Sequence, residues 1–196
     1  MLSLVAIEYL FAVLVVIVFT NRYVLGSLLR ISDRRTEGGF GIDPPVWPTV
    51  AIVVPVYNEG NHVLQTAASF EALDYPRDRL QVVFIDDLST DDTFEHLTTV
   101  TKTYPWMKVI QNEKNVGKRI GIKNAVLKTH SDLIMSVDSD VIVDKSALRI
   151  LVRHLYSTGV DAAGGCVFVS NADTNWLTRM QAVKYWIGYQ FLKNVE

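Results

Sequence analysis

Two aspartates stand one residue apart in a segment that is otherwise apolar. Residues 133–143 read LIMSVDSDVIV, and Asp138 and Asp140 carry the only charges in it. A buried carboxylate is costly unless it is paired or bound to a metal. Carboxylate oxygens are ligands that Mg²⁺ and Mn²⁺ prefer. Because residues i and i+2 of a strand face the same side, both carboxylates can point to one ion.

Two carboxylates are too few for a metal cage made by the protein alone, so a diphosphate is expected to complete the coordination shell. The structural alternative is a solvated loop that begins at Asp138. A turn does not require two carboxylates against such an apolar background, and the metal site is therefore the favoured interpretation.

Three further polar motifs also follow apolar runs: PVYNEG at 55–60, DDLSTDD at 86–92 and NVGKR at 115–119. Each motif has a structural alternative, because turns and helix N-caps use the same residue types. A cap does not account for Asp86 and Asp87, which end the apolar run itself. Lys118 and Arg119 at the start of a helix are unfavourable against its dipole unless an anion binds there.

The elements that must position these motifs alternate in type. Apolar β-branched runs predict strands, and helical spacing of apolar residues predicts helices between them. The predicted strands are 50–57, 80–87, 106–112, 132–138 and 162–170, and the predicted helices are 62–73, 92–104, 118–129, 145–156 and 175–194. This alternation indicates an α/β fold with a mostly parallel sheet, in which ligands bind beyond the carboxyl ends of strands. Since each motif follows a strand, one site at one rim is expected.

The N-terminal segment differs in kind from the rest. Residues 2–20 carry one charge, Glu8, and have about the length of a bilayer span. A signal peptide would need a basic start and a small-residue cleavage site, and the segment has neither. The sequence therefore predicts a transmembrane helix at 1–25 and a juxtamembrane linker at 26–48. The alternative is a buried N-terminal helix of a soluble fold.

The basic residues come after this segment, at Arg22, Arg30, Arg34 and Arg35. Basic residues accumulate on the cytoplasmic side of membrane helices. The lipid bilayer is thus an expected partner, with the protein in the cell membrane and its following domain on the cytoplasmic side.

Composition excludes several other classes. The net charge is −2, which gives no basic surface of the kind that nucleic-acid binding requires. No G-x-G-x-x-G follows the first predicted strand and no Walker A motif is present, so neither a dinucleotide Rossmann site nor a P-loop is expected. Apolar residues make up 49% of the chain, which is enough for a sizeable core.

In order along the chain, PVYNE, DD-x-S-T-D, N-x-GK-R and VDSD resemble the inverting glycosyltransferases of family 2, which have the GT-A fold. NVGKR, SVDSD, DTNWLT and KYW resemble more narrowly the membrane-bound processive synthases of hyaluronan, chitooligosaccharides, chitin and, more distantly, cellulose. The resemblance implies a GT-A part, a mostly parallel sheet flanked by helices, at 49–196. It also implies transfer of a sugar from UDP-GlcNAc, UDP-GlcA or UDP-Glc to a growing β-linked oligo- or polysaccharide.

The resemblance implies roles for the first two motifs in nucleotide binding. Pro55, Tyr57 and Glu59 would line the uracil pocket, with Tyr57 near the base. Asp86 or Asp87 would hydrogen-bond the uracil or the ribose.

The other two motifs would bind the diphosphate. Lys118, with Arg119, would contact the phosphates. Asp138 and Asp140 would hold Mg²⁺ or Mn²⁺ against the UDP diphosphate, which places Asp138 in the nucleotide site as well. Cys166, on the fifth predicted strand, is expected to be a small buried core residue, and the resemblance offers a position near the donor sugar as the alternative.

The sequence also departs from this family. Its members carry a later acidic motif, [T/G]-E-D or G-D-D, that supplies the general base, and a Q-x-x-R-W motif. Neither occurs in this chain, whose sequence stops at Glu196, at the end of the long helix predicted from residue 175. We therefore expect the N-terminal part of a longer enzyme, with its base downstream, and no transfer by these residues alone.

Two alternatives from other classes stay open. VDSDVIV approaches the D-x-D-x-[TV] signature of haloacid-dehalogenase-type phosphatases, in which the first aspartate is the nucleophile. That signature normally follows the first strand, and position 142 is here Ile. The second alternative is a non-catalytic subunit that binds a nucleotide sugar, which would fit the missing base.

Overall fold

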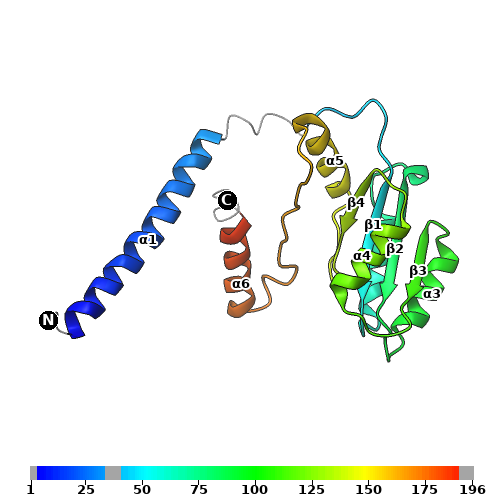
Figure 1. Cartoon of the computed structure of the whole chain (residues 1–196), viewed down its shortest axis with the longest axis horizontal. Coiled ribbons are helices and arrows are strands. Elements are labelled where there is room, and N and C mark those ends of the chain that lie inside the picture. The colour runs from blue at the N-terminus through cyan, green and yellow to red at the C-terminus, as the bar shows by residue number, and fades with distance from the viewer. Residues whose placement is uncertain (1–3, 34–40, 190–196) are drawn as a thin grey trace. The chain divides into compact units, whose positions relative to one another are not determined.

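The computed structural model describes residues 4–33 and 41–189 (Figure 1). The chain divides into two compact units, one formed by residues 41–163 and the other by residues 1–40 together with 164–196. The polar motifs found in the sequence all belong to the unit of residues 41–163.

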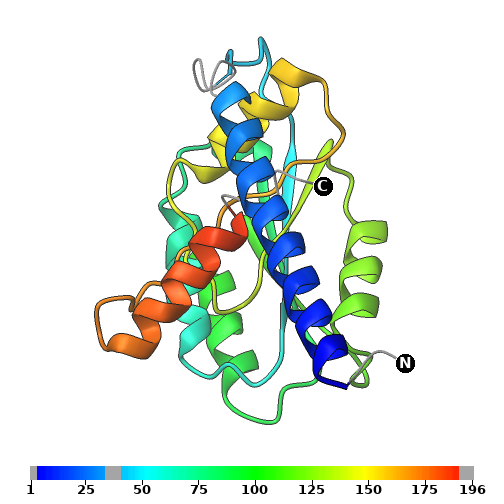
Figure 2. The same cartoon turned by 90° about the vertical axis from the view of Figure 1, so that its left-hand side faces the viewer.

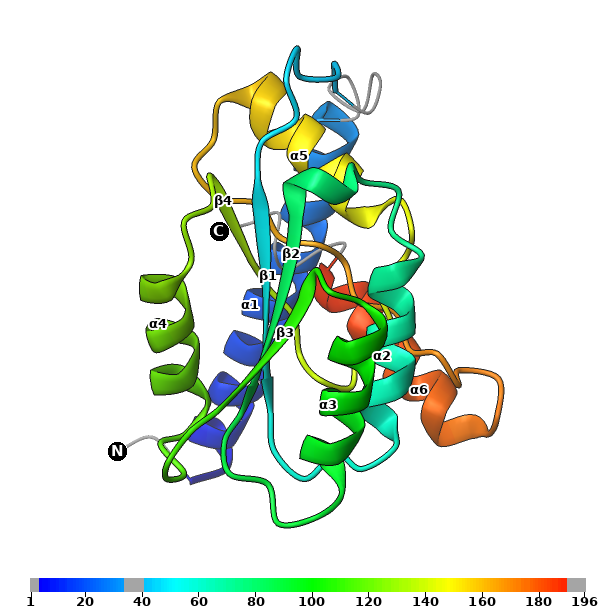
Figure 3. The same ribbon diagram turned by 90° about the vertical axis from the view of Figure 1, so that its right-hand side faces the viewer.

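A four-stranded parallel sheet forms the centre of the 41–163 unit. Its strands are β1 (Val50–Val56), β2 (Leu80–Asp86), β3 (Met107–Gln111) and β4 (Leu133–Ser136). They lie in the order β3-β2-β1-β4, and every neighbouring pair is parallel (Figure 3). All carboxyl ends therefore meet at one edge of the sheet, and the predicted α/β fold with a parallel sheet is confirmed.

Helices cover both faces of this sheet. They are α2 (His62–Glu71), α3 (Thr93–Thr103), α4 (Lys118–Lys128) and α5 (Ala147–Thr158), with a short 3-10 helix at Arg77–Arg79. Figure 3 shows α4 on one side of the sheet and α2 and α3 on the other.

The strand sequences account for this layering. Along β1, Ile52 and Val54 belong to the apolar cluster that includes Phe70 of α2, whereas Val53 packs in a second cluster with Ala125 of α4. Alternate residues of a strand face opposite sides. Because both faces are covered, β1 is apolar throughout rather than alternating between apolar and polar residues.

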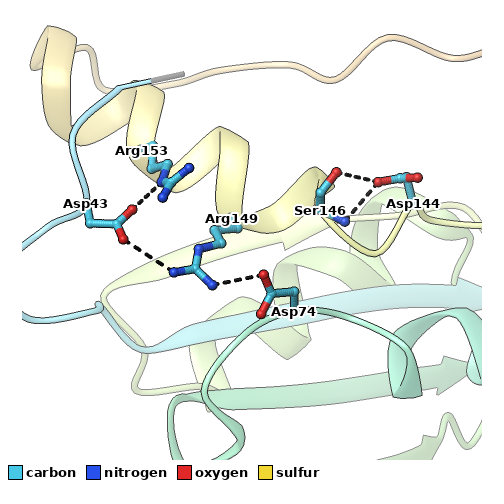
Figure 4. A network of polar contacts seen from close by, with 6 residues as sticks. All are labelled: Asp43, Asp74, Asp144, Ser146, Arg149 and Arg153. Carbon is cyan, nitrogen blue, oxygen red and sulfur yellow. Dashed lines mark hydrogen bonds and ion pairs between the residues drawn. The ribbon is translucent and has the colours of Figure 1, made fainter. Parts of the chain in front are cut away.

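The segment before β1 is fastened to α5 by ion pairs (Figure 4). Arg149 lies 2.8 Å from Asp74 and 3.3 Å from Asp43, and Arg153 also bonds Asp43. The guanidinium of Arg149 stacks over the ring of Trp47 at 4.9 Å. Hydrogen bonds from Arg153 and then from Arg149 hold the pKa of Asp43 below its usual value, although burial opposes them. Asp43 thereby fixes the chain where it enters the sheet.

Helix α5 itself begins at a local polar turn that Figure 4 also shows. The backbone N–H of Ser146 donates to the Asp144 carboxylate at 2.8 Å, and the Ser146 hydroxyl donates to the same oxygen at 2.5 Å. These bonds from Ser146 hold the pKa of Asp144 below its usual value.

The predicted fifth strand, 162–170, is wrong. The structure gives this segment no strand, and Cys166 within it is exposed rather than buried in a core. A strand is stabilised by hydrogen bonds to a neighbour, and the described sheet ends at β4 without pairing to these residues. An apolar β-branched run is therefore not sufficient to form a strand here.

The last predicted helix is present as α6 (Trp176–Ile187), which begins with a capping box between Asn175 and Thr178. The final residues of that prediction, 190–194, lie outside the described residues.

The N-terminal segment forms one continuous helix, α1 (Leu4–Asp33), which runs past residue 25 (Figure 2). Among the residues that the structure describes, no helix combines the length and the apolar character needed to cross a membrane. The transmembrane helix predicted at 1–25 is thus not supported. The uninterrupted apolar stretch between Glu8 and Thr20 is shorter than the roughly 20 residues of a bilayer span.

Candidate functional site

A cavity of about 280 Å³ opens at the carboxyl ends of the strands. It is lined by Pro55, Val56, Tyr57, Glu59, Asp87, Lys118, Asp138, Ser139 and Asp140. These residues come from the ends of β1 and β2, the start of α4 and the turn after β4. The structure therefore brings together residues of all four motifs, which are far apart in the sequence. Two predicted residues, Asp86 and Arg119, are not in the lining.

The carboxylate pair sits in a turn rather than in the strand. Strand β4 ends at Ser136, and the backbone N–H of Val141 donates to the carbonyl oxygen of Asp138 at 3.2 Å. Asp138 and Asp140 are exposed, whereas Ser139 between them is buried. Both aspartates line the same cavity, but they extend from this turn and not from an alternating strand.

Lys118 is the cation of the cavity. Its ammonium nitrogen lies 2.6 Å from a carboxylate oxygen of Asp138. Lys118 is the first residue of α4, and Gly117 before it has a φ of 82°, a conformation that favours glycine. Arg119, the next residue, is exposed and lies outside the cavity lining. A helix turns by about 100° per residue, so neighbours on a helix do not share a face.

The two aspartates at the end of β2 have different surroundings. Asp86 is completely buried, and its carboxylate accepts hydrogen bonds from Gln111 at 2.8 Å and from the backbone and hydroxyl of Ser89. It is therefore a structural acceptor between β2 and β3. Of the two residues that the sequence left as alternatives for the nucleotide contact, only Asp87 reaches the cavity.

Asp87 shapes the loop that leads to Lys118. Its carboxylate accepts from the backbone N–H groups of Val116 at 2.9 Å and Gly117 at 2.7 Å, and from the Asn112 side chain at 2.9 Å. Burial raises the pKa of Asp87, but the hydrogen bonds from Val116, Asn112 and Gly117 outweigh it and leave the pKa below its usual value. Asp87 is thus held as a carboxylate at neutral pH.

The loop after β1 is locked to the loop after β2. Asn58 has a φ of 54°, and its side-chain oxygen accepts from the backbone N–H of Thr90 at 2.8 Å. The N–H of Gly60, at a φ of 52°, donates to Thr93 at 2.8 Å and to Asp91 at 3.1 Å. These bonds fix the loop that presents Tyr57 and Glu59 to the cavity.

The cap expected from the DDLSTDD motif is made differently. Asp92 is the N-cap residue of α3 by position, but its side chain makes no capping bond. Instead, Asp91 accepts from the backbone N–H of Thr93 at 3.1 Å as well as from Gly60. The motif therefore caps the helix and joins two loops of the site at once.

The charges of the cavity favour a cation beside the carboxylate pair. The cavity lining holds four carboxylates, those of Glu59, Asp87, Asp138 and Asp140, and one ammonium group, that of Lys118. Within residues 4–33 and 41–189, no group of three or more His, Cys, Asp or Glu is placed to hold a metal. Mg²⁺ and Mn²⁺ at phosphate sites are commonly bound by one or two carboxylates, while phosphate oxygens and water fill the other coordination positions. The carboxylate pair of this cavity has that composition.

Sequence reasoning missed Val56 and Ser139 in the lining and Asn112 behind it. Ser139 donates its hydroxyl to a carboxylate oxygen of Glu59 at 2.7 Å, which joins the first motif to the fourth. Its position between the two aspartates was the available signal. Asn112 carried no signal in the sequence. Only the structure shows that its amide donates to Asp87, which follows the neighbouring strand.

The fold and the site define a class of protein. Residues 51–196 match the sequence profile described as glycosyl transferase family 2, and the chain belongs to this family. An N-acetylglucosaminyltransferase of Azorhizobium caulinodans is 29% identical over 191 residues, which are 95% of this chain and 47% of that protein. One of Mesorhizobium japonicum is 34% identical over 152 residues, or 74% of this chain and 35% of that protein. The chain thus spans at most about half the length of these relatives.

Solved structures share the fold. A mannosyltransferase from Pyrobaculum calidifontis, in complex with GDP-Man and Mn²⁺, aligns with a TM-score of 0.61 and 23% identity over 78% of this chain and 46% of its own. S. aureus TarS 1–349 in complex with UDP-GlcNAc aligns with a TM-score of 0.53 and 22% identity over 63% of this chain and 38% of its own. At such identities the likeness concerns the GT-A-like fold.

Proposed function

We propose that this chain is the donor-binding part of an inverting glycosyltransferase that uses a UDP-sugar. The observation that carries the proposal is the meeting of Lys118, Asp138 and Asp140 in one cavity at the carboxyl ends of a parallel sheet. A cation and a carboxylate pair at this rim suit a nucleoside diphosphate with its divalent metal. Membership of family 2 supports the same conclusion.

The residues of the cavity have distinct tasks in this proposal. Asp138 and Asp140 would hold Mg²⁺ or Mn²⁺, which supplies Lewis-acid stabilisation of the charge on the departing diphosphate. Lys118 adds a positive charge at the same place, and the N-terminus of α4 behind it favours an anion. Pro55, near the end of β1, and Tyr57 and Glu59 in the loop after it would line the place of the uracil base.

The reaction proposed is a single displacement. An acceptor hydroxyl oxygen forms a bond to the anomeric carbon while the bond from that carbon to the UDP oxygen breaks, and UDP leaves with the electron pair. The hydroxyl proton passes to a general base, which the family resemblance places in a later acidic motif. Attack from the face opposite to UDP inverts the anomeric centre.

We further propose UDP-GlcNAc as the donor and a growing β-linked chitin- or hyaluronan-like saccharide as the acceptor. The relatives named N-acetylglucosaminyltransferase support the donor among the three that the sequence left open. The acceptor rests on the resemblance of NVGKR and SVDSD to processive synthases. A panel of UDP-GlcNAc, UDP-GlcA and UDP-Glc, assayed with the full-length enzyme, decides between the donors.

The proposed donor site is tested by binding. In a titration of the full 196-residue chain with UDP, Mn²⁺ should tighten binding, and Asp140→Ala should abolish that gain. Asp161→Ala, at an exposed position away from the cavity lining, is the matched control and should keep the gain. Equal UDP affinity with and without metal in the unaltered chain would refute the proposed role of the carboxylate pair.

The location at the cytoplasmic face of the cell membrane is a separate proposal. It is supported by the large apolar side chains that α1 exposes, among them Leu10, Phe11, Leu14 and Phe19. Exposed apolar surface of this kind marks contact with lipid or protein. Fractionation of cells that produce the full-length protein tests it, and recovery in the supernatant after lysis without detergent would contradict it.

A further inference from the structure

Helix α2 is hydrogen-bonded to the turn that carries Asp138 and Asp140. The hydroxyl of Thr66 donates to the carbonyl oxygen of Ser139 at 2.6 Å. Thr66 is 1% exposed and Ser139 is 8% exposed, so water does not compete for this bond. Because Ser139 stands between Asp138 and Asp140, the bond fixes the backbone from which both carboxylates extend.

The same helix holds the segment at a second point. The hydroxyl of Ser69 accepts from the backbone N–H of Val143 at 3.1 Å and donates to the carbonyl oxygen of Thr66 at 2.7 Å. Residues three apart on a helix lie on one face. One buried polar face of α2 therefore anchors the chain on both sides of Asp140.

The direction of the Thr66 bond is unusual for a threonine within a helix. Such hydroxyls commonly bond a carbonyl of their own helix, as Thr98 does with Phe94 at 2.8 Å in α3. Thr66 instead donates to a different segment of the chain. Valine has nearly the same shape and would fill the position without any polar group. The hydroxyl is thus required by the turn and not by the packing of α2.

We propose that Thr66 is a positioning residue of the metal site, acting through the carbonyl of Ser139. The inference rests on the proposed function, since it concerns how Asp138 and Asp140 are held for the metal. Groups that orient metal ligands without touching the metal commonly change metal affinity by about 10- to 100-fold when they are lost. Thr66 should therefore affect metal-dependent UDP binding and leave metal-free UDP binding unchanged.

The test compares Thr66→Val and Thr66→Ser in the full chain. UDP is titrated in the presence of Mn²⁺ and in the presence of a chelator, and the ratio of the two affinities gives the metal-dependent gain. Thr66→Val should lower this gain about tenfold without changing the affinity measured with chelator. Thr66→Ser keeps the hydroxyl and should therefore show the same metal-dependent gain as the unaltered chain. Thr98→Val removes a helix hydroxyl that is bonded within α3 and is not in the cavity lining, and it should behave like the unaltered chain.

Two results would overturn the inference: a folded Thr66→Val chain with the full gain, or an equal loss of UDP affinity with and without metal. If Thr66→Val does not fold, Thr66→Ala, which adds no methyl group at the contact, replaces it with the same expected loss. An unaltered chain that shows no metal-dependent gain refutes the proposed metal site itself. That failure is seen before any variant is compared, so the two failures are distinguishable.

Discussion

The ammonium nitrogen of Lys118 lies 2.6 Å from a carboxylate oxygen of Asp138, although the two residues follow different strands of the sheet. Their side chains are 53% and 56% exposed. Exposed ion pairs contribute only about 0–1 kcal/mol to stability. The contact is therefore important for the charge it places in the cavity and not for the strength of the fold.

Lys118→Met should weaken UDP binding in the presence of Mn²⁺ by about tenfold, because a charge-assisted hydrogen bond to phosphate contributes about 1.5 kcal/mol or more. The same variant should bind Mn²⁺ alone more tightly, since no ammonium then competes for the Asp138 oxygen. Isothermal titration of the full chain with UDP and with MnCl₂ measures both effects.

The prediction for Lys118→Met is specific because UDP binding should weaken while Mn²⁺ binding should tighten. Lys102→Met removes an exposed lysine in the last turn of α3 and serves as the control, with both affinities unchanged. Loss of both affinities in Lys118→Met would show damage to the site as a whole, and unchanged UDP binding would remove Lys118 from the diphosphate contact.

Asp87→Asn should lower the free energy of unfolding at pH 7 by about 1 kcal/mol, because one amide oxygen cannot accept from all three donors that the carboxylate serves. Asp87 has a folded-state pKa below its ordinary value of 3.8. The unfolded chain therefore binds more protons in that window, and the stability from Asp87 is lost as the pH falls from about 3.8 through the folded pKa. Urea unfolding at a series of pH values measures it.

The difference between Asp87→Asn and the unaltered chain should accordingly shrink below pH 3.8 and stay constant above it. Asp161→Asn, at an exposed position, is the matched control and should leave the free energy of unfolding at pH 7 unchanged. A gap that stays equally wide in strong acid would mean that Asp87 is not held by these hydrogen bonds.

Much of the fold followed from the sequence because its signals are local. The apolar runs at 50–57 and 80–87 are β1 and β2 within one residue, and the helix predicted at 118–129 is α4. The segment 162–170 has the same type of run, yet it has no described partner strand and forms none. Strand formation depends on pairing, which a local pattern does not contain.

The site was predictable to the level of motifs and less so for single residues. Asp138 and Asp140 were found because two carboxylates are anomalous in an apolar segment. The sequence could not show which of Asp86 and Asp87 faces the cavity. Adjacent residues of an extended chain face opposite sides, and only the structure shows which side forms the cavity. Thr66 carried no signal, since a threonine in a helix is ordinary until its partner is known.

Asn58→Ala should lower the free energy of unfolding by about 2 kcal/mol, and Asn58→Gly by about 1 kcal/mol. Both variants lose the hydrogen bond from Thr90. Alanine is further destabilised because its side chain disfavours the left-handed backbone at a φ of 54°, which glycine adopts freely. Denaturant unfolding of the three chains gives the order. Equal losses for alanine and glycine would contradict the left-handed conformation of this loop.

Arg149→Lys should lower the urea midpoint almost as much as Arg149→Met. Arg149 bonds Asp74 and Asp43 through different nitrogens and stacks on Trp47, and a single ammonium cannot reproduce this arrangement. Arg179→Met, which alters a mostly exposed arginine, should leave the midpoint unchanged. Full recovery by lysine would show that only the charge of Arg149 is used.

Cys166 should react with a thiol reagent in the folded chain nearly as fast as in the urea-unfolded chain. The structure exposes this residue, and it is the single cysteine of the sequence, so the reaction reports on one position. A cysteine packed in a sheet would be protected by the opening free energy of that region and would react orders of magnitude more slowly. The rate of absorbance change with Ellman's reagent, with Cys166→Ser as the blank, measures it. Strong protection of Cys166 from the reagent in the folded chain would contradict its exposure and would support the buried strand predicted from the sequence at 162–170.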